Sequence, residues 1–446
     1  MRHQDVGTTQ PIIAGLVTSA VGFTSTFVLV LTGLRSVGAD PRQAVSGLLL
    51  LCVTMGGLAV LLGLRHRQPL SFAWSTPGAA LLVSAGHQHG GYGYAVGAFL
   101  VAGLLIAVTG LWSRLGELIA SIPAHLATAL LAGVLLPLCL APVHAAVQLP
   151  SLALPVVAAW ALLTRFARRW ATPGALLVTV LVLLLRHPAA SGPTVGLLPI
   201  PTFTAPAFNA GTLAGIALPL YVITMAAQNV PGLAVLTHFG YRPRTRPILL
   251  GTGLTTAAGS VAGVYMVNLA AITAALVAGP DAHPDRDRRW IASVTSGAAY
   301  VLFGLTAGLS AALLSAAPPL LIEAVAGLAL LGTLGSALAS ALSAETGREA
   351  AVITFVVAAS GVTALGIGAP FWGLLAGLAA HALFRRGRVT AGAGTGEAGA
   401  GAGSATVAQP VAGGPGSEPV TPAGPAARPT DVPAPARVIR HSPDHS

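Results

Sequence analysis

The sequence predicts an all-α integral membrane protein with fourteen membrane-spanning segments, and two observations lead to this class. Hydrophobic residues make up 54% of the 446 residues and charged residues only 8%, with a mean hydropathy of +0.78. Soluble domains carry about 25% charged residues, so a soluble protein is excluded. Between residues 11 and 385, apolar runs of roughly 18 to 25 residues follow one another, the length that a helix needs to cross about 30 Å of hydrocarbon.

The expected spans can be given in chain order. We expect them over residues 11–33, 44–64, 72–88, 93–112, 123–143, 150–167, 172–186, 211–236, 247–264, 265–279, 290–316, 318–342, 349–367 and 369–385. The third and the tenth are too short or too interrupted to be plain spanning helices. Cys52 and Cys139 fall inside spans, where a small packing residue is the simplest interpretation.

The arginines predict the orientation. The chain has no lysine, and 17 of its 23 arginines fall on the cytoplasmic side if the N-terminus is cytoplasmic and fourteen segments cross. Only Arg35, Arg42 and Arg186 fall outside, and the last three arginines lie in the C-terminal tail. This bias follows the positive-inside rule, so we expect both termini in the cytoplasm. Membrane topology also explains the formal net charge of +10 better than nucleic-acid binding does.

The two ends of the chain differ from the apolar region. Residues 1–10 are polar and lack an apolar stretch, so we expect no cleaved signal peptide. From Val389 the composition changes to Gly, Ala, Pro, Ser and Thr, and we expect a disordered cytoplasmic tail over residues 386–446. The sequence contains no phosphate-binding loop, ATPase motif or catalytic Ser/His/Asp set. We therefore expect no enzyme, no cofactor and no metal site.

Weak internal similarity divides the apolar region into two halves. "LRSVGADPR" (34–42) resembles "LTHFGYRPR" (236–244) at an offset of 202, and "AALLVSAG" (79–86) resembles "ITAALVAG" (272–279) at an offset of 193. Seven spans in each half give the second half an inverted topology, as in many secondary transporters. The expected repeats are residues 11–186 and 211–385, joined by an extracytoplasmic connector over 187–210. Chance similarity between low-complexity membrane segments is the alternative.

The third segment, "PLSFAWSTPGAALLVSAG" (69–86), contains a helix-start signal in its middle. Ser75 and Thr76 before Pro77 and Gly78 predict an extended entry over 70–76, followed by a short helix. At the offset of 193, Ser75 corresponds to Asn268, which we expect to cap an equivalent helix in the tenth segment. Two antiparallel extended pieces would pair, and two helix N-termini meeting at the membrane centre would favour an anion. A packed kink is the alternative.

Further polar residues are expected to face the same place. The eighth segment carries Gln228 and Asn229 in "MAAQNVPG", and the first carries Thr24 and Phe27 in "FTSTF". Amides at this depth need a partner, so they are either ligand contacts or bonds between helices. Trp74 and Phe27 would provide a flat apolar wall, with ordinary core packing as the alternative.

These stretches resemble the benzoate transporter family of bacterial inner-membrane proteins. The resemblance rests on "QPIIAGLVTSAVGFTSTFVLVL", "AWSTPGAALL", "MAAQNVPG", "NLAAITAA" and "AGLALLGTLGSAL", and it covers about residues 11–385. It implies proton-coupled uptake of benzoate or a similar aromatic carboxylate. It also implies the seven-plus-seven fold shared with nucleobase and sulfate transporters, with a core domain (11–112 and 211–316) and a gate domain. Dimers are common in this fold, so a homodimer is expected by analogy.

The proton carrier is not assigned by the sequence. Nucleobase carriers of this fold tend to place acidic side chains in the eighth and tenth spans, where Gln228 and Asn268 stand here. Glu323 and His125 are the candidate ionisable groups inside spans, although structural roles suit them equally well. The substrate can also cross with its own proton. A carrier of another anion or a nucleobase, and a passive anion channel, remain alternatives.

Overall fold

The computed structural model describes residues 8–86, 90–112, 114, 122–186, 198–270, 272–315, 317–343, 347–365 and 367–393. The described residues do not include residues 1–7, residues 187–197 of the connector or the tail beyond residue 393. The predicted disorder of the tail therefore stays a prediction. The last helix continues to Ala393. It therefore extends past residue 386, where we expected the tail to begin.

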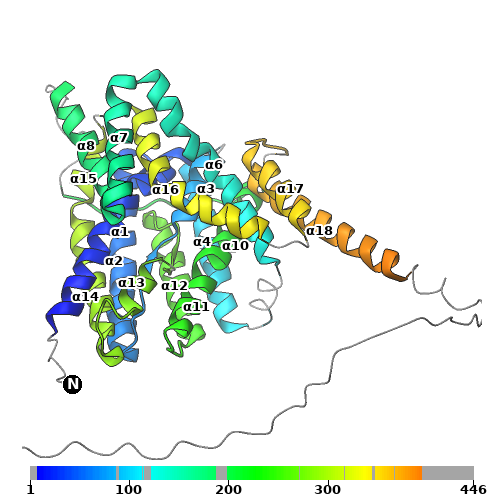
Figure 1. Ribbon diagram of the computed structural model, residues 1–446, viewed down its shortest axis with the longest axis horizontal. Coiled ribbons are helices and arrows are strands. Elements are labelled where there is room, and N and C mark those ends of the chain that lie inside the picture. The colour runs from blue at the N-terminus through cyan, green and yellow to red at the C-terminus, as the bar shows by residue number, and fades with distance from the viewer. Residues whose placement is uncertain are drawn as a thin grey trace, which may run out of the picture. The chain divides into compact units, whose positions relative to one another are not determined.

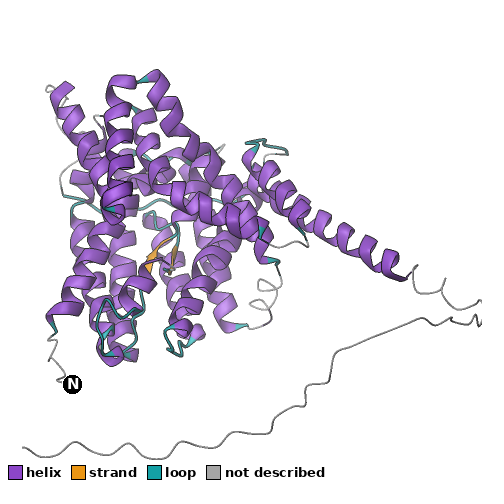
Figure 2. Cartoon of the chain, in the orientation of Figure 1, coloured by secondary structure: helices purple, strands orange, loops and turns teal. Residues whose placement is uncertain are grey.

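Helices make up most of the described chain (Figures 1 and 2). The first half contains α1 (Thr9–Ser36), α2 (Pro41–His66), β1 (Phe72–Trp74), α3 (Thr76–Ala85), α4 (Tyr92–Leu111), α6 (Ala124–Gln148), α7 (Pro150–Phe166) and α8 (Ala171–Arg186). The second half begins with α9 (Ala210–Thr212), α10 (Leu218–Thr224) and α11 (Val230–His238), which π-helical turns at Leu213–Ala217 and Met225–Asn229 join into one helix. It continues with α12 (Thr245–Gly259), β2 (Val267–Leu269), α13 (Ile272–Ala278), α14 (Trp290–Leu305), α15 (Ala307–Ser315), α16 (Pro319–Leu342), α17 (Arg348–Ala359) and α18 (Ala369–Ala393).

Local sequence signals set the helix boundaries. At the start of α2, the Asp40 carboxylate accepts hydrogen bonds from the N–H groups of Arg42 and Gln43, both at 2.8 Å. The Gln43 side chain accepts one from the Asp40 N–H, which completes a capping box. Pro41 occupies the first helical position, where its missing N–H costs nothing. The helix ends at His66, and the next residue, Arg67, adopts a left-handed conformation.

The two strands pair antiparallel near the middle of the helices (Figure 2). Phe72 lies opposite Leu269, Ala73 opposite Asn268, and Trp74 opposite Val267. Matching hydrogen bonds extend the ladder at both ends. The Ser75 N–H donates to the Met266 carbonyl at 3.1 Å, and the Ala270 N–H donates to the Ser71 carbonyl at 2.8 Å. The pairing therefore satisfies backbone groups that interrupted helices would leave unpaired inside a membrane.

Glycines allow two helix pairs to approach closely. α2 packs against α14 where Gly56 faces Gly297, and a Cβ on Gly297 would lie 2.7 Å from the Gly56 carbonyl oxygen. α4 packs against α12 where Gly103 faces Gly253, and a Cβ on Gly253 would lie 2.7 Å from the Gly103 carbonyl oxygen. Packing of backbone on backbone is a common way for membrane helices to associate, because lipid offers them little hydrophobic driving force.

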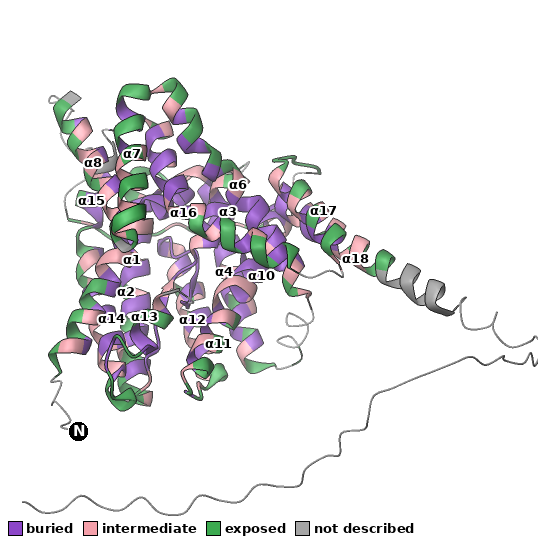
Figure 3. Ribbon diagram, in the orientation of Figure 1, coloured by how far each residue is buried: buried purple, intermediate pink, exposed green. Residues whose placement is uncertain are grey.

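The outer surface of the helices is apolar. Figure 3 shows exposed residues along the outward sides of the helices, and large side chains such as Val147, Phe166 and Leu185 are among them. Six of the described helices are long and apolar enough to cross a membrane, namely α1, α2, α4, α6, α16 and the helix from Ala210 to His238. Each of the fourteen expected segments coincides with a helix, a run of helices or a strand–helix pair.

Candidate functional site

A cavity of about 260 Å³ lies beside the strand pair. One set of lining residues comes from α1, the two interrupted segments and α14: Thr18, Val21, Gly22, Ser25, Thr26, Ala73, Trp74, Thr76, Pro77, Ala270, Thr273, Leu276 and Tyr300. The remaining lining residues are Gln228 in the second π-helical turn, Thr172 of α8, and Ala329, Leu330 and Thr333 of α16. Both interrupted segments therefore border one cavity, and helices from both halves of the chain close it.

The start of α3 forms as the sequence predicts. Ser75 keeps an extended backbone, and the helix begins at Thr76 with Pro77 in its first turn. The Ser75 hydroxyl accepts a hydrogen bond from the Gly78 N–H at 3.1 Å and so caps the helix. It also shares a hydrogen bond of 2.9 Å with the hydroxyl of Thr224 in α10. Thr76 and Pro77 line the cavity, whereas Ser75 and Gly78 are buried outside its lining.

The second interrupted segment differs from our expectation, because Asn268 does not cap a helix. Asn268 lies inside β2 opposite Ala73, and α13 begins at Ile272. The two strands begin 195 residues apart, not 193, so the residue equivalent to Ser75 is Ala270. Ala270 has no side-chain acceptor and lines the cavity directly. The error of two residues arises because short runs of Ala, Leu and Val align with themselves in more than one register.

Asn268 instead braces the strand pair. The amide orientation that satisfies both neighbours places its nitrogen 3.1 Å from the Ala73 carbonyl oxygen and its oxygen 3.3 Å from the Ser75 nitrogen. The side chain is fully buried and does not line the cavity. It therefore fixes the backbone next to the cavity rather than reaching into it.

The two neighbouring amides of the eighth segment have different positions. Gln228 lines the cavity and is half-buried. Asn229 is fully buried, and its side-chain oxygen accepts a hydrogen bond of 2.8 Å from the Leu269 N–H. Its nitrogen lies 3.3 Å from the sulfur of Met225. Asn229 thus attaches β2 to the eighth segment, as Ser75 attaches the start of α3 through Thr224.

Aromatic side chains form one wall of the cavity. Trp74 and Tyr300 line it, with their rings edge to face and their centroids 6.0 Å apart. Phe23 packs edge to face against Trp74 and stacks on Phe27 with centroids 5.1 Å apart. Phe27 therefore supports the wall from behind.

The indole of Trp74 is held in place by α1. Its Nε1–H donates a hydrogen bond of 3.0 Å to the hydroxyl of Thr26, which also lines the cavity. Thr24, which we expected at the site, donates a hydrogen bond of 2.7 Å to the Ala20 carbonyl of its own helix and lies outside the lining. The residues of this stretch that line the cavity are thus Ser25 and Thr26.

We expect Trp74→Phe and Thr26→Val to weaken substrate binding by the same factor, about fivefold, because each removes the same hydrogen bond of about 1 kcal/mol. The double variant should bind no more weakly than either single variant, since the two residues act as one unit. Titration of purified protein with benzoate, the ligand that the sequence resemblance implies, checks this by isothermal calorimetry. Additive losses in the double variant would contradict a shared role.

Hydroxyl groups dominate the polar lining. Thr18, Ser25, Thr26, Thr76, Thr172, Thr273 and Thr333 all border the cavity, and none of its described lining residues is Arg, His, Asp or Glu. An anion in this cavity would be held by hydroxyls, the Gln228 amide and backbone N–H groups of the first helical turns. The sequence did not single out several of the lining residues, because isolated hydroxyl residues are common in membrane helices and carry no motif. These are Thr18, Ser25, Thr172, Thr273, Tyr300 and Thr333.

Glu323 and His125 lie outside the cavity lining. Glu323 is half-buried in α16. His125, near the start of α6, lies beside His381 of α18 with ring centroids 5.2 Å apart. A part for either residue in proton coupling remains a prediction.

The arrangement of the helices is shared with solved membrane proteins. The transmembrane domain of a cyanobacterium bicarbonate transporter, BicA, shares the fold with a TM-score of 0.53 and 14% identity over 82% of this chain and 97% of that one. Murine Solute Carrier 26 family member A9, an anion transporter solved in the inward-facing state, gives a TM-score of 0.56 and 12% identity over 87% and 69%.

Sequence comparison identifies the family. A family model described as benzoate membrane transport protein matches residues 7–383. The chain is 37% identical to inner membrane protein YdcO of Escherichia coli over 82% of its length and 93% of that relative. It is 30% identical to the benzoate membrane transport protein of Acinetobacter baylyi over 83% and 93%. The chain therefore belongs to the benzoate membrane transport protein family, whose members are transporters and not enzymes.

Proposed function

We propose that this protein imports benzoate or a related aromatic carboxylate together with protons across the bacterial inner membrane. The observation that carries the proposal is the cavity, which combines an aromatic wall at Trp74 and Tyr300 with hydroxyls and the Gln228 amide. Its volume of about 260 Å³ lies below the roughly 300 Å³ at which sites for drug-sized ligands begin, so it suits a single ring. The benzoate membrane transport protein of A. baylyi supports the substrate, and inner membrane protein YdcO of E. coli supports the membrane.

The proposed architecture is an inverted repeat of seven plus seven spans. In such a repeat α2 corresponds to α12, and α4 corresponds to α14. The contact of α2 with α14 therefore has its equivalent in the contact of α4 with α12, and the structure contains both. The facing glycines agree, since Gly56 and Gly253 are 197 residues apart and Gly103 and Gly297 are 194 apart. The strand pair agrees as well, because Ser75 and Ala270 are 195 residues apart and so are Ser71 and Met266. The hydrogen bond from Ser75 to Met266 is therefore the equivalent of the one from Ala270 to Ser71. Both termini are then cytoplasmic, as the arginines predict.

In the proposed mechanism a core domain moves against a gate domain. α1–α4 and residues 210–315 form the core, and α6–α8 with α16–α18 form the gate. The cavity supports this division, because its lining joins α1, α3 and α14 of the core to Thr172 and Thr333 of the gate. Displacement of the core relative to α8 and α16 would open the cavity to one side and then to the other.

We infer that the substrate carries the proton. Burying a carboxylate without a cationic partner is costly, whereas the neutral acid loses far less on desolvation and can donate a hydrogen bond. The described lining offers acceptors for that proton in the Gln228 side-chain oxygen and the threonine hydroxyls. This route needs no titrating residue in the cavity.

Uptake into proteoliposomes tests the function. An imposed inward proton gradient should concentrate labelled benzoate above the external level, and collapse of the gradient with an ionophore should release it. Equilibration without accumulation would instead identify a passive anion channel. Competition by salicylate but not by uracil or sulfate is expected, because only salicylate presents an aromatic ring next to a carboxylate. Stronger competition by uracil or sulfate would contradict the proposed substrate class.

A further inference from the structure

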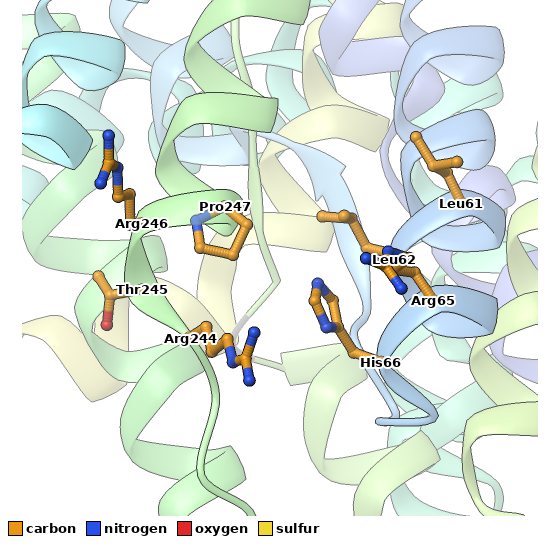
Figure 4. Close-up of a pocket in the computed structure, with 8 residues that line it drawn as sticks. All are labelled: Leu61, Leu62, Arg65, His66, Arg244, Thr245, Arg246 and Pro247. Carbon is orange, nitrogen blue, oxygen red and sulfur yellow. The ribbon is translucent and has the colours of Figure 1, made fainter.

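A second pocket lies between the end of α2 and the start of α12 and shares no lining residue with the substrate cavity. Its volume is about 690 Å³. Leu61, Leu62, Arg65 and His66 line it from α2, and Arg244, Thr245, Arg246 and Pro247 line it from the other side. Figure 4 shows the Arg244 side chain extending toward His66 and Arg65 across the gap.

The polar part of this pocket is cationic. Arg65, Arg244 and Arg246 bring three guanidinium groups to one pocket, and all three side chains belong to exposed residues. Within the described chain the recorded ion pair joins Arg288 and Asp285, so none of these three arginines is neutralised by a carboxylate. Like charges held together at the edge of a low-dielectric region repel one another, and a bound anion relieves that repulsion.

The start of α12 adds hydrogen-bond donors to the pocket. Arg244 occupies the cap position and makes no side-chain cap hydrogen bond. Thr245 and Arg246 are the first two residues of this 15-residue helix, and both line the pocket. Their N–H groups have no partner within the helix, and the helix dipole places partial positive charge at this end. Together with the arginines, this end of α12 suits a phosphate oxygen.

The rest of the pocket is apolar and continues onto a lipid-facing surface. Leu61 and Leu62 line it, and Leu61 is 64% exposed. Leu64, one turn further along α2, is 51% exposed. A soluble anion would use only the cationic part. A phospholipid would use both parts, with its phosphate at the arginines and an acyl chain along the leucines.

The spacing of the two walls is set by the loop before α12. The Gln68 side chain, just after α2, donates a hydrogen bond of 3.3 Å to the Arg242 carbonyl. The positive-inside rule places this end of both helices at the cytoplasmic leaflet, where anionic lipids attract basic residues. We propose that this pocket binds the phosphodiester headgroup of an anionic phospholipid such as phosphatidylglycerol, and that the lipid joins α2 to α12.

Native mass spectrometry of the full-length protein, with phosphatidylglycerol titrated into the detergent solution, tests the site. The Arg65→Gln/Arg244→Gln double variant loses two arginine contacts to the headgroup and should bind the lipid roughly 30-fold more weakly. This factor corresponds to about 2 kcal/mol, or about 1 kcal/mol for each arginine. Arg168→Gln, which removes an exposed arginine outside the pocket, should bind like the wild type. Hydrogen exchange in nanodiscs should show phosphatidylglycerol-dependent protection of residues 61–68 and 242–250, compared with phosphatidylcholine alone.

Three outcomes would overturn the proposal. The first is equal phosphatidylglycerol binding by the double variant and the wild type. The second is an equal loss in Arg168→Gln, which would indicate a diffuse charge effect. The third is displacement of the lipid by inorganic phosphate at equal concentration, which would indicate a site for a soluble anion. Circular dichroism of the double variant separates lost binding from lost folding, and the exchange pattern of the wild type tests the site without any substitution.

Discussion

Gln228→Leu should reduce benzoate binding and uptake by about two orders of magnitude and leave the melting temperature of the protein unchanged. Gln228 is the one amide among the described lining residues of the cavity. Loss of the amide leaves the buried carboxyl group of the substrate without a hydrogen-bond partner, which costs about 1–3 kcal/mol or roughly five- to 150-fold in affinity. Gln228 is half-buried at the cavity, and leucine has a similar volume, so the substitution should leave the packing of the helix intact.

The matched control is Thr24→Val. Thr24 was a candidate site residue, but its hydroxyl bonds to the Ala20 carbonyl and does not line the cavity. Uptake by this variant should stay within about twofold of the wild type, because surface-like changes away from a site have small effects. Binding by calorimetry and thermal unfolding of each purified variant provide the measurements. Normal uptake by Gln228→Leu would exclude the proposed site.

Gly56→Val is expected to cause the largest loss of stability. A Cβ at this position would collide with the Gly297 carbonyl and would lie 2.9 Å from Cγ2 of Val301. Insertion of one extra methylene into a packed core costs about 1–3 kcal/mol, and valine adds three carbons at a backbone contact. α2 and α14 must then separate, so we expect a melting temperature lowered by many degrees and a reduced yield of monodisperse protein.

The neighbouring position provides the control. A Cβ on Gly57 would have no atom within 4 Å, so Gly57→Val should fold like the wild type. Gly253→Val should reproduce the defect of Gly56→Val, because its Cβ would meet the Ala107 nitrogen and lie 2.7 Å from the Gly103 carbonyl oxygen. Size-exclusion chromatography and thermal unfolding in detergent compare the three. Stable protein from both Gly56→Val and Gly253→Val would contradict the paired helix crossings.

The sequence predicted the elements better than their contacts. Pro77 after two hydroxyl residues was enough to place the start of α3, because proline and the serine cap act on the local backbone. The strand pairing followed from the need to satisfy backbone groups in lipid. Its register did not follow, and Asn268 was therefore assigned to a helix cap instead of the ladder.

Which polar residues face the cavity depends on tertiary structure. Gln228 and Asn229 are adjacent and chemically alike, yet one lines the cavity and the other bonds to the Leu269 N–H. Thr24 and Thr26 differ in the same way. The rotation of each helix about its axis separates these cases, and uniformly apolar segments give little sequence signal for that rotation. For the same reason the threonines of α8 and α16 could not be recognised as lining residues.

The ladder between β1 and β2 limits how the cavity can open. Each strand uses the other to occupy its backbone groups, so neither half-membrane helix can withdraw alone without exposing peptide dipoles to hydrocarbon. In the proposed mechanism the strand pair would therefore move as one rigid unit, and access to the cavity would change by displacement relative to α8 and α16, which contribute Thr172 and Thr333 to its lining.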